Sequence, residues 1–407
     1  MINTKLGSNT TLSAIRRQTG AGSLCAFMKM YLPHRVPLPW SRMHKEMSTD
    51  FDQIGSGEPL HLVLAAPDGY GKTTMTTFGL VLWALAYKRC RCIAIGSHTR
   101  TAAGELLRSV DHELSTNKML CTDFSHLADL QRGSGSSGSR ASPPRDIYVR
   151  GVARLTTFGP TSSLGEITFE GSPPDLIILD GFEASPEESE GPDGRDGKSV
   201  KLERHIHREI LSRYTGASVI VLGPLTHANS LIDRILDPFQ SMRWTKRFYQ
   251  AVDSYPAKFD LWFSWAELWH KDPAQAKHYL DEHREQLLDG VEVLWPEHES
   301  FEQMMSLRAL HGWEWFDRNR QGAPPGGCWR ICDPFKITLY PGGDGTEKQF
   351  IVDHAGYRRE WSQQTGGEGR TVMLTRGLAM LAREDDLPSQ VRPVPISQNV
   401  EDGGTAF

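Results

Sequence analysis

The sequence has no apolar run close to the length of about 20 residues that a membrane-spanning helix needs. Its first residues are polar with scattered charges, a composition that does not predict a secretion signal. Neither sign of charge dominates, because 45 Lys and Arg stand against 50 Asp and Glu and the formal net charge is -5. The overall charge therefore points to no particular partner, and a nucleic-acid surface would have to be a local patch.

Cysteine is scarce as well: the 407 residues include six, at positions 25, 90, 92, 121, 328 and 332. They lack the second CxxC pair, or the paired histidines, of a zinc site. We expect reduced, partly buried thiols in a cytosolic protein. The length allows two domains, or one large domain with an appendage, and the sequence contains no internal repeat.

A glycine-rich stretch is the most informative part of the chain. It reads APDGYGKTT and comprises Ala66, Pro67, Asp68, Gly69, Tyr70, Gly71, Lys72, Thr73 and Thr74. An apolar run at residues 60–66 precedes it and a helical apolar run at 75–87 follows, which is the strand–loop–helix context of a phosphate-binding loop. The alternative is a chance glycine turn, and Ala66 stands where the general pattern has its first glycine.

The residue types of this loop suit a bound triphosphate. Glycines let backbone N–H groups turn inward around an anion, and the N-terminus of the following helix adds partial positive charge. Lys72 can reach the β- and γ-phosphates, and the Thr73 hydroxyl can bind Mg²⁺. The sequence therefore predicts a nucleotide-binding protein with ATP and Mg²⁺ as cofactors.

Between the loop and residue 250, short apolar runs alternate with helical patterns, which is typical of a parallel sheet with crossover helices. We expect strands at residues 92–97, 155–158, 166–169, 175–179 and 218–222, and helices at 99–114 and 231–236. Beyond residue 250 helices dominate. One should begin at Pro273, and another should follow a capping box of Ser300 and Gln303. The predicted fold class is α/β, a P-loop NTPase-type, mainly parallel sheet flanked by helices, with a helical C-terminal extension.

Asp180 follows the apolar residues 176–179, so we place it at the C-terminal end of a buried strand. There it can hold the Mg²⁺ that Thr73 also binds, at the edge where open α/β sheets bind ligands; the other interpretation is a turn residue. Hydrolysis also needs a group that orients water, and Gly181 has no side chain to do so. Glu183 is the nearest candidate, because residues 181 and 183 face the same side if the extended chain continues. Otherwise Glu183 only opens the acidic loop that follows.

The strand at 218–222 could carry a sensor for the γ-phosphate, and Gly223 and Thr226 follow it. The hydroxyl of Thr226 could sense the γ-phosphate, although a role in capping the next helix explains this residue equally well.

Charge and aromatic residues give two weaker signals of nucleic-acid binding. Basic residues gather at 195–213, directly after an acidic run at 183–193, and could contact phosphates or form a solvated helix face. Trp262, Trp265 and Trp269 fall at near-helical spacing. This spacing favours a packed core over a surface on which bases stack.

Taken together, these motifs resemble the large terminase subunit of tailed bacteriophages, the motor that packages viral DNA. The similarity extends through residues 27–47, the loop APDGYGKTT, the segments DLIILDGFE and GPLTHANSLIDRIL, and residues 294–324. It covers about residues 25–335, and the combination is far more specific than any single motif.

The resemblance implies an ATPase whose hydrolysis drives double-stranded DNA into a procapsid in the cytoplasm of the bacterial host. Lys72, Asp180 and Glu183 would be its catalytic residues, and Gly223 and Thr226 would belong to its coupling segment. The implied partners are the DNA, a small terminase subunit and a portal protein, with several copies of the chain in a ring and no membrane. The implied parts are a lead-in segment at 1–50, an ATPase core at 51–250, a helical linker subdomain at 251–325, and a partial nuclease-like region with a disordered tail at 326–407.

Three departures from the family bear on the activity. Asp68 stands where the family often has an arginine, and Gly181 replaces the second acid. The family's nuclease is ribonuclease H-like and needs about 150 residues, whereas 67 follow Tyr340. Residues 350–355, FIVDHA, resemble the strand that opens this nuclease and make Asp353 a possible first metal ligand. We therefore expect an incomplete ribonuclease H-like region.

Two other functions fit part of the sequence. The first is a degenerate prophage product that binds nucleotide or partners without catalysis, which the departures at Asp68 and Gly181 favour. The second is a helicase-like translocase on nucleic acid. A helicase should carry a second complete motor domain, and no second α/β repeat is visible in the sequence.

Overall fold

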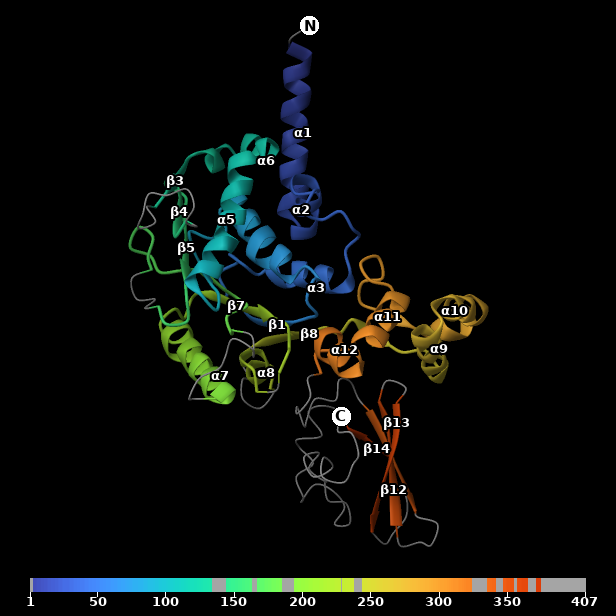
Figure 1. The fold of residues 1–407 in the computed structure, drawn as a ribbon. Helices are drawn as coiled ribbons and strands as arrows, with labels where there is room; N and C mark the ends of the chain where they lie inside the picture. The colour runs from blue at the N-terminus through green and yellow to red at the C-terminus, as the bar shows by residue number, and fades with distance from the viewer. Residues whose placement is uncertain are drawn as a thin grey trace. The chain divides into compact units, whose positions relative to one another are not determined.

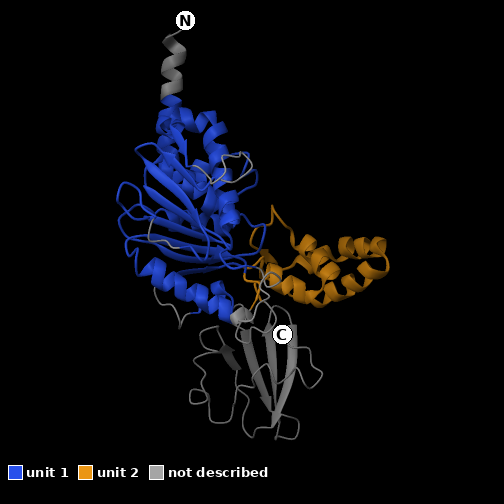
Figure 2. Cartoon of the chain, turned by 60° about the vertical axis from the view of Figure 1, so that its left-hand side comes forward, with its two compact units in different colours: residues 1–224, 229–249 blue, residues 225–228, 250–407 orange. Residues whose placement is uncertain are grey.

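The structure, a computed structural model, describes residues 3–133, 144–162, 167–184, 194–227, 229–237, 244–323, 335–341, 347–354, 357–364 and 371–374. The chain divides into two compact units (Figure 2). The first comprises residues 1–224 and 229–249, and the second comprises residues 225–228 and 250–407. Within the described part of the chain, no helix combines the length and the apolar character needed to cross a membrane.

The described residues of the first unit form an eight-stranded sheet in the order β3-β4-β5-β2-β6-β7-β1-β8 (Figure 1). The strands are β1 (His61–Ala65), β2 (Cys92–Gly96), β3 (Leu130–Arg132), β4 (Asp146–Val149), β5 (Ala153–Phe158), β6 (Leu176–Asp180), β7 (Ser218–Gly223) and β8 (Thr245–Phe248). From β5 to β8 in this order every neighbouring pair is parallel, whereas β4 and β3 pair antiparallel at one edge. The expected α/β fold with a mostly parallel sheet is confirmed.

Helices cover both faces of this sheet, which explains why the central strands are buried along their whole length. Every residue of β2, β6 and β7 is buried, as is typical of parallel strands enclosed on two sides. In Figure 1, α5 (Arg100–Thr116) and α6 (Lys118–Asp123) lie above the sheet, and α7 (Gly194–His205) and α8 (Leu231–Leu236) lie below it. Since β7 separates β1 from β6 and all three are parallel, the loops after β1 and β6 leave the sheet at the same edge.

The helix after β1 begins in an unusual way. Its first part, η1 (Thr74–Leu80), is π-helical, and α4 (Val81–Ala86) continues it in α-helical form. Segments of π-helix are rare and often lie at functional sites. Gly79 allows α2 (Leu24–Tyr31) to pack closely on η1, because a Cβ atom there would lie 2.4 Å from Met28 Sδ.

The remaining elements of the first unit are α1 (Asn3–Ala21), α3 (Arg42–Phe51), η2 (Ser125–Ala128) and η4 (Ile206–Leu211). The prediction of a strand at 166–169 is wrong for residues 167–169, which the structure describes. Phe169 forms only an isolated bridge with Ser172. The chain turns back immediately at Glu170 and Gly171, which have φ angles of 49° and 80°. The four described cysteines, Cys25, Cys90, Cys92 and Cys121, are free thiols, and burial raises the pKa of each.

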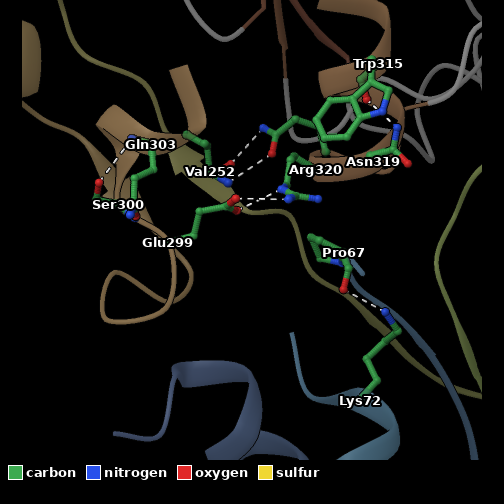
Figure 3. A network of polar contacts seen from close by, with 10 residues as sticks. Pro67, Lys72, Val252, Glu299, Ser300, Gln303, Trp315, Asn319 and Arg320 are labelled. Carbon is green, nitrogen blue, oxygen red and sulfur yellow. Dashed lines mark hydrogen bonds and ion pairs between the residues drawn. The ribbon is translucent and has the colours of Figure 1, made fainter. Parts of the chain in front are cut away.

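Helices dominate the second unit. They are α9 (Asp260–Lys271), α10 (Pro273–Leu288), α11 (Phe301–His311) and α12 (Trp313–Arg320), with the short strands β9 (Val252–Ser254) and β10 (Glu292–Val293). The expected starts of α10 and α11 are confirmed, and both hydrogen bonds of the Ser300–Gln303 capping box are present. Figure 3 shows this box beside the ion pair of Arg320 with Glu299.

Two of the three tryptophans of α9 form part of the core of this unit, as expected, whereas Trp269 is half-buried. Trp262 and Trp265 are each only 3% exposed. The Trp262 ring meets the rings of Trp265 and Phe301 edge-on, with centroids 5.1 and 5.4 Å apart, an arrangement that aromatic pairs prefer.

The second unit also contains an antiparallel sheet of four strands, β11 (Phe335–Pro341), β12 (Glu347–His354), β13 (Tyr357–Gln364) and β14 (Thr371–Leu374), in the order β13-β12-β11-β14. Asp353 lies in β12, in register with Lys336 on one neighbour and Arg358 on the other. Its role as a nuclease metal ligand stays a prediction. The tail expected at 384–407 lies outside the described residues.

Candidate functional site

The glycine-rich loop connects β1 to η1 and closes on the side chain of Lys72. The ammonium Nζ donates to Ala66 O at 2.7 Å and to Pro67 O at 2.8 Å, and Figure 3 shows it directed at Pro67. It also lies 3.4 Å from Asp68 Oδ1. Gly69 and Gly71 have φ angles of 83° and 79°, in the region that L side chains rarely adopt, so the glycines are needed where the sequence places them.

Asp180, the last residue of β6, faces the start of the helix that follows the loop. Its Oδ1 accepts a hydrogen bond from Thr73 Oγ1 at 3.1 Å, and its Oδ2 accepts one from Thr77 Oγ1 at 2.5 Å. The structure thus brings the loop and Asp180 together at one sheet edge. Sequence reasoning did not single out Thr77, although its spacing of four residues from Thr73 places both hydroxyls on one helix face.

Neighbouring strands fix the backbone at the end of β6. Ser97, which follows β2, donates its hydroxyl to Asp180 O at 2.7 Å. On the other side, Gly181 N donates to Leu222 O of β7 at 3.1 Å. The hydroxyls of Thr73 and Thr77 therefore hold the Asp180 carboxylate, and the bonds from Ser97 and to Leu222 hold its backbone.

Burial disfavours the charged forms of both functional groups. The Lys72 side chain is 7% exposed; burial lowers the pKa of its ammonium, while the nearby carboxylates of Asp68 and Asp180 oppose this shift. Asp180 is 8% exposed, and burial raises the pKa of its carboxyl against the hydrogen bonds from Thr77 and Thr73 and the charge of Lys72. Groups whose pKa is displaced by burial beside an opposite charge are common at functional sites.

The oxygen atoms at this edge suit Mg²⁺. This ion prefers oxygen ligands and is commonly held by one or two protein groups together with phosphate and water. Thr73 Oγ1 and Asp180 Oδ1 converge at 3.1 Å, and Lys72 lies in the adjoining loop. The residues present therefore fit a metal-bound triphosphate. Among the described residues, no group of three or more His, Cys, Asp or Glu side chains forms a separate metal site.

Gly181 and Glu183 do not lie as the sequence predicted. Gly181 has a φ of 54°, so the extended backbone ends at Asp180, and the premise that residues 181 and 183 face the same side is wrong. The Glu183 carboxylate accepts hydrogen bonds from Leu231 N at 2.7 Å and from Ser199 Oγ. It therefore holds the first residue of α8, where a negative charge is favourable. That Glu183 orients water stays a prediction.

The two residues proposed for coupling lie in different units. Gly223 ends β7, where a Cβ atom would lie 2.8 Å from Ile232 Cδ1 of α8, so this glycine allows close packing. Thr226 belongs to the second unit, and its Oγ1 lies 3.4 Å from His227 Nδ1. A role in sensing phosphate stays a prediction for both.

The basic residues of α7 and η4 lie partly on the surface. Lys201, Arg204 and Arg208 are exposed along these two helical segments. The acidic residues of the same segments form ion pairs: Glu203 pairs with Arg234 at 2.6 Å, and Glu209 pairs with Arg213 at 3.6 Å. The acidic run at 185–193 lies outside the described residues.

Replacing Asp180 with Asn should raise the melting temperature of the nucleotide-free protein at neutral pH by about 2–4 °C, equivalent to ~1 kcal/mol. Asn carries no charge to bury, and the Thr73 and Thr77 hydroxyls can accept as well as donate. Because burial raises the folded-state pKa above the ordinary 3.8, the wild-type protein regains this stability as the pH falls toward that value.

The gain from Asp180→Asn should therefore shrink as the pH falls from neutral toward 3.8 in thermal melts followed by circular dichroism. A loss of stability at neutral pH, or a gain that does not change with pH, would contradict the argument from burial.

No protein-family profile matches the chain, and no curated protein does. Among solved structures, a similarity is found to an arginine-to-alanine mutant of the large terminase ATPase domain of Thermus phage P74-26. The sequence identity is 10%, the TM-score is 0.31, and the match covers 62% of this chain and 94% of the other. At these values the similarity carries no argument, and any function rests on the sequence and on the geometry of the site.

Proposed function

We propose that this chain binds Mg·ATP at the loop of residues 66–74 and hydrolyses it as the motor of a viral DNA-packaging terminase. Lys72 would bind the β- and γ-phosphates, and Thr73 with Asp180 would hold Mg²⁺, which neutralises charge on the phosphates when bound. The observation that carries the proposal is the 3.1 Å contact between Thr73 and Asp180, which joins the loop to the end of β6.

The electrostatics of the site support a ligand that carries both phosphate and metal. A buried ammonium and a buried carboxylate are each costly unless they are paired. Lys72 bonds to carbonyl oxygens of its own loop and pairs at 3.4 Å with Asp68, whose side chain is largely exposed, whereas Asp180 bonds to two hydroxyls. A phosphate beside Lys72 and a divalent cation beside Asp180 would place an opposite charge directly next to each buried group.

The DNA-packaging part of the proposal rests on the sequence segments around the loop and on the exposed cations of α7 and η4. Lys201, Arg204 and Arg208 offer charges of the kind that contact DNA phosphates. Double-stranded DNA as substrate, a small terminase subunit and a portal protein as partners, and a ring of several copies belong to this proposal.

A second candidate function is a remnant that binds nucleotide without turning it over. Two observations favour it. Gly181 offers no side chain to orient water, and the carboxylate of Glu183 bonds to Leu231 N and Ser199 Oγ. The experiments below separate this remnant from an active motor.

Replacing Lys72 with Ala should lower the rate of Mg²⁺-dependent ATP hydrolysis about 100-fold or more, because the charge that stabilises the phosphates is lost. Wild-type hydrolysis should rise when linear double-stranded DNA is added. Both rates are measured by phosphate release from purified protein. The matched control is Lys118→Ala, which removes an exposed lysine from α6 and should leave both rates unchanged. A hydrolysis rate that does not change when DNA is added would contradict the motor function. Binding of ATP without hydrolysis would indicate the remnant.

Replacing Glu183 with Gln tests whether the Glu183 carboxylate orients the attacking water. If the carboxylate has this role, kcat should fall about 100-fold while the affinity for Mg·ATP stays the same. Gln still offers an oxygen to Leu231 N, so α8 should keep its anchor. A lower melting temperature with an unchanged kcat would show that Glu183 has only a structural role, and another group would then have to orient the water.

Replacing Asp68 with Asn should increase the affinity for Mg·ATP by about two- to fivefold, as expected for removing one repulsive surface charge. Asp68 lies 3.4 Å from Lys72 Nζ and brings a negative charge to the place where phosphate would bind. Since its side chain is 63% exposed, the effect should weaken as salt is added. Titration calorimetry at low and high salt measures both effects, and an unchanged affinity at low salt would contradict the prediction.

A further inference from the structure

His44 lies outside the glycine-rich loop in sequence but contacts its backbone. The ring belongs to α3 and is only 1% exposed. Its Nε2 lies 3.1 Å from Tyr70 O, the carbonyl group directly before Gly71. Trp40 packs against the imidazole, with the two ring centroids 5.4 Å apart.

The hydrogen bonds of the ring fix which nitrogen carries the proton. Ser41 N lies 3.2 Å from His44 Nδ1, and a backbone N–H can only donate, so Nδ1 is the acceptor. The Ser41 hydroxyl lies 2.8 Å from the same nitrogen. A neutral ring then carries its proton on Nε2, and this N–H donates to Tyr70 O.

This hydrogen bond sets the direction of the Tyr70–Gly71 peptide. In a trans peptide the C=O and N–H groups point to opposite sides, and the described chain has no cis peptide bond. With Tyr70 O directed at His44, the Gly71 N–H points away from the imidazole. The ring also occupies the space of a side chain at position 71, because a Cβ atom there would lie 2.9 Å from His44 Nε2.

The helix that carries His44 is itself tied to the edge of the sheet. Asp50 of α3 receives two hydrogen bonds of 2.8 Å from the guanidinium of Arg247 in β8. Glu46 accepts a hydrogen bond of 2.7 Å from the hydroxyl of Tyr249, just after β8. A bidentate pair of this kind adds geometric specificity as well as energy, and it stabilises the end of α3 six residues beyond His44.

We propose that His44 is a positioning residue for the phosphate loop: its Nε2–H holds the Tyr70 carbonyl so that the Gly71 N–H is directed at a bound phosphate. This inference rests on the proposed function, because it takes a phosphate as the ligand of the loop. His44 itself does not touch the ligand. It orients one of the backbone donors that do.

Two substitutions separate this role from a general contribution to stability. His44→Gln keeps an N–H donor near the position of Nε2, whereas His44→Leu has none. Asp50→Asn is the control, since it weakens the attachment of α3 to β8 without touching the loop. All four proteins, including the wild type, are compared in the nucleotide-free state by amide hydrogen exchange of residues 69–73 and by thermal melting.

We expect His44→Leu to speed exchange of the loop amides about three- to tenfold, as for the loss of one hydrogen bond, and His44→Gln to restore most of the protection. Asp50→Asn should lower the melting temperature but leave these amides close to the wild-type rate. The inference is overturned if His44→Leu leaves the loop unchanged, if Gln fails to restore it, or if Asp50→Asn loosens the loop as much.

Binding of Mg·ATP, measured by calorimetry on the same proteins, then connects the loop to its ligand. His44→Leu should weaken binding about three- to tenfold, and His44→Gln should recover it. If the wild-type protein binds no Mg·ATP, the proposed function fails, whereas the exchange rates still decide whether His44 positions the loop. Equal affinities for the wild type and His44→Leu would overturn the inference.

Discussion

The site depends on one contact, in which Thr73 and Asp180 meet at 3.1 Å although 107 residues separate them in the chain. It exists because β1 and β6 run parallel with only β7 between them, so the segments that follow both strands share one edge of the sheet. Burial then displaces the pKa of Lys72 and of Asp180 toward the neutral forms. The fold thus keeps two poorly solvated charges together, which a phosphate and a divalent cation would both relieve.

Residues outside the loop hold this arrangement in place, and they come from several elements. Thr77, one turn beyond Thr73, bonds to the second carboxylate oxygen of Asp180. Ser97, after β2, bonds to the backbone of the same residue. His44 reaches the loop from α3. Groups that fix the orientation of a site in this way matter for precision, because a bound ligand gains most from donors that need no rearrangement.

The backbone at the end of β6 disfavours a second acidic residue at position 181, directly after Asp180. Gly181 adopts a φ of 54°, which would cost a residue with a side chain about 1–2 kcal/mol. The backbone therefore turns away from the strand, and Glu183 reaches the start of α8 instead. Because α8 packs on β1 and β7, Glu183 connects the segment after Asp180 to a helix that covers these two strands.

The sequence by itself determined the glycine-rich loop, β6 with its neighbours β2 and β7, and the starts of α10 and α11. Each of these has a local signal: glycine spacing, an apolar run or a cap. It did not determine β3, β4 and β8, which are short and partly polar and form at the sheet edge through pairing. Only the tertiary structure decided that Thr77 and His44 join the site and that Glu183 holds α8. Their hydrogen bonds link segments distant in the chain, and such contacts leave no periodic pattern in the sequence.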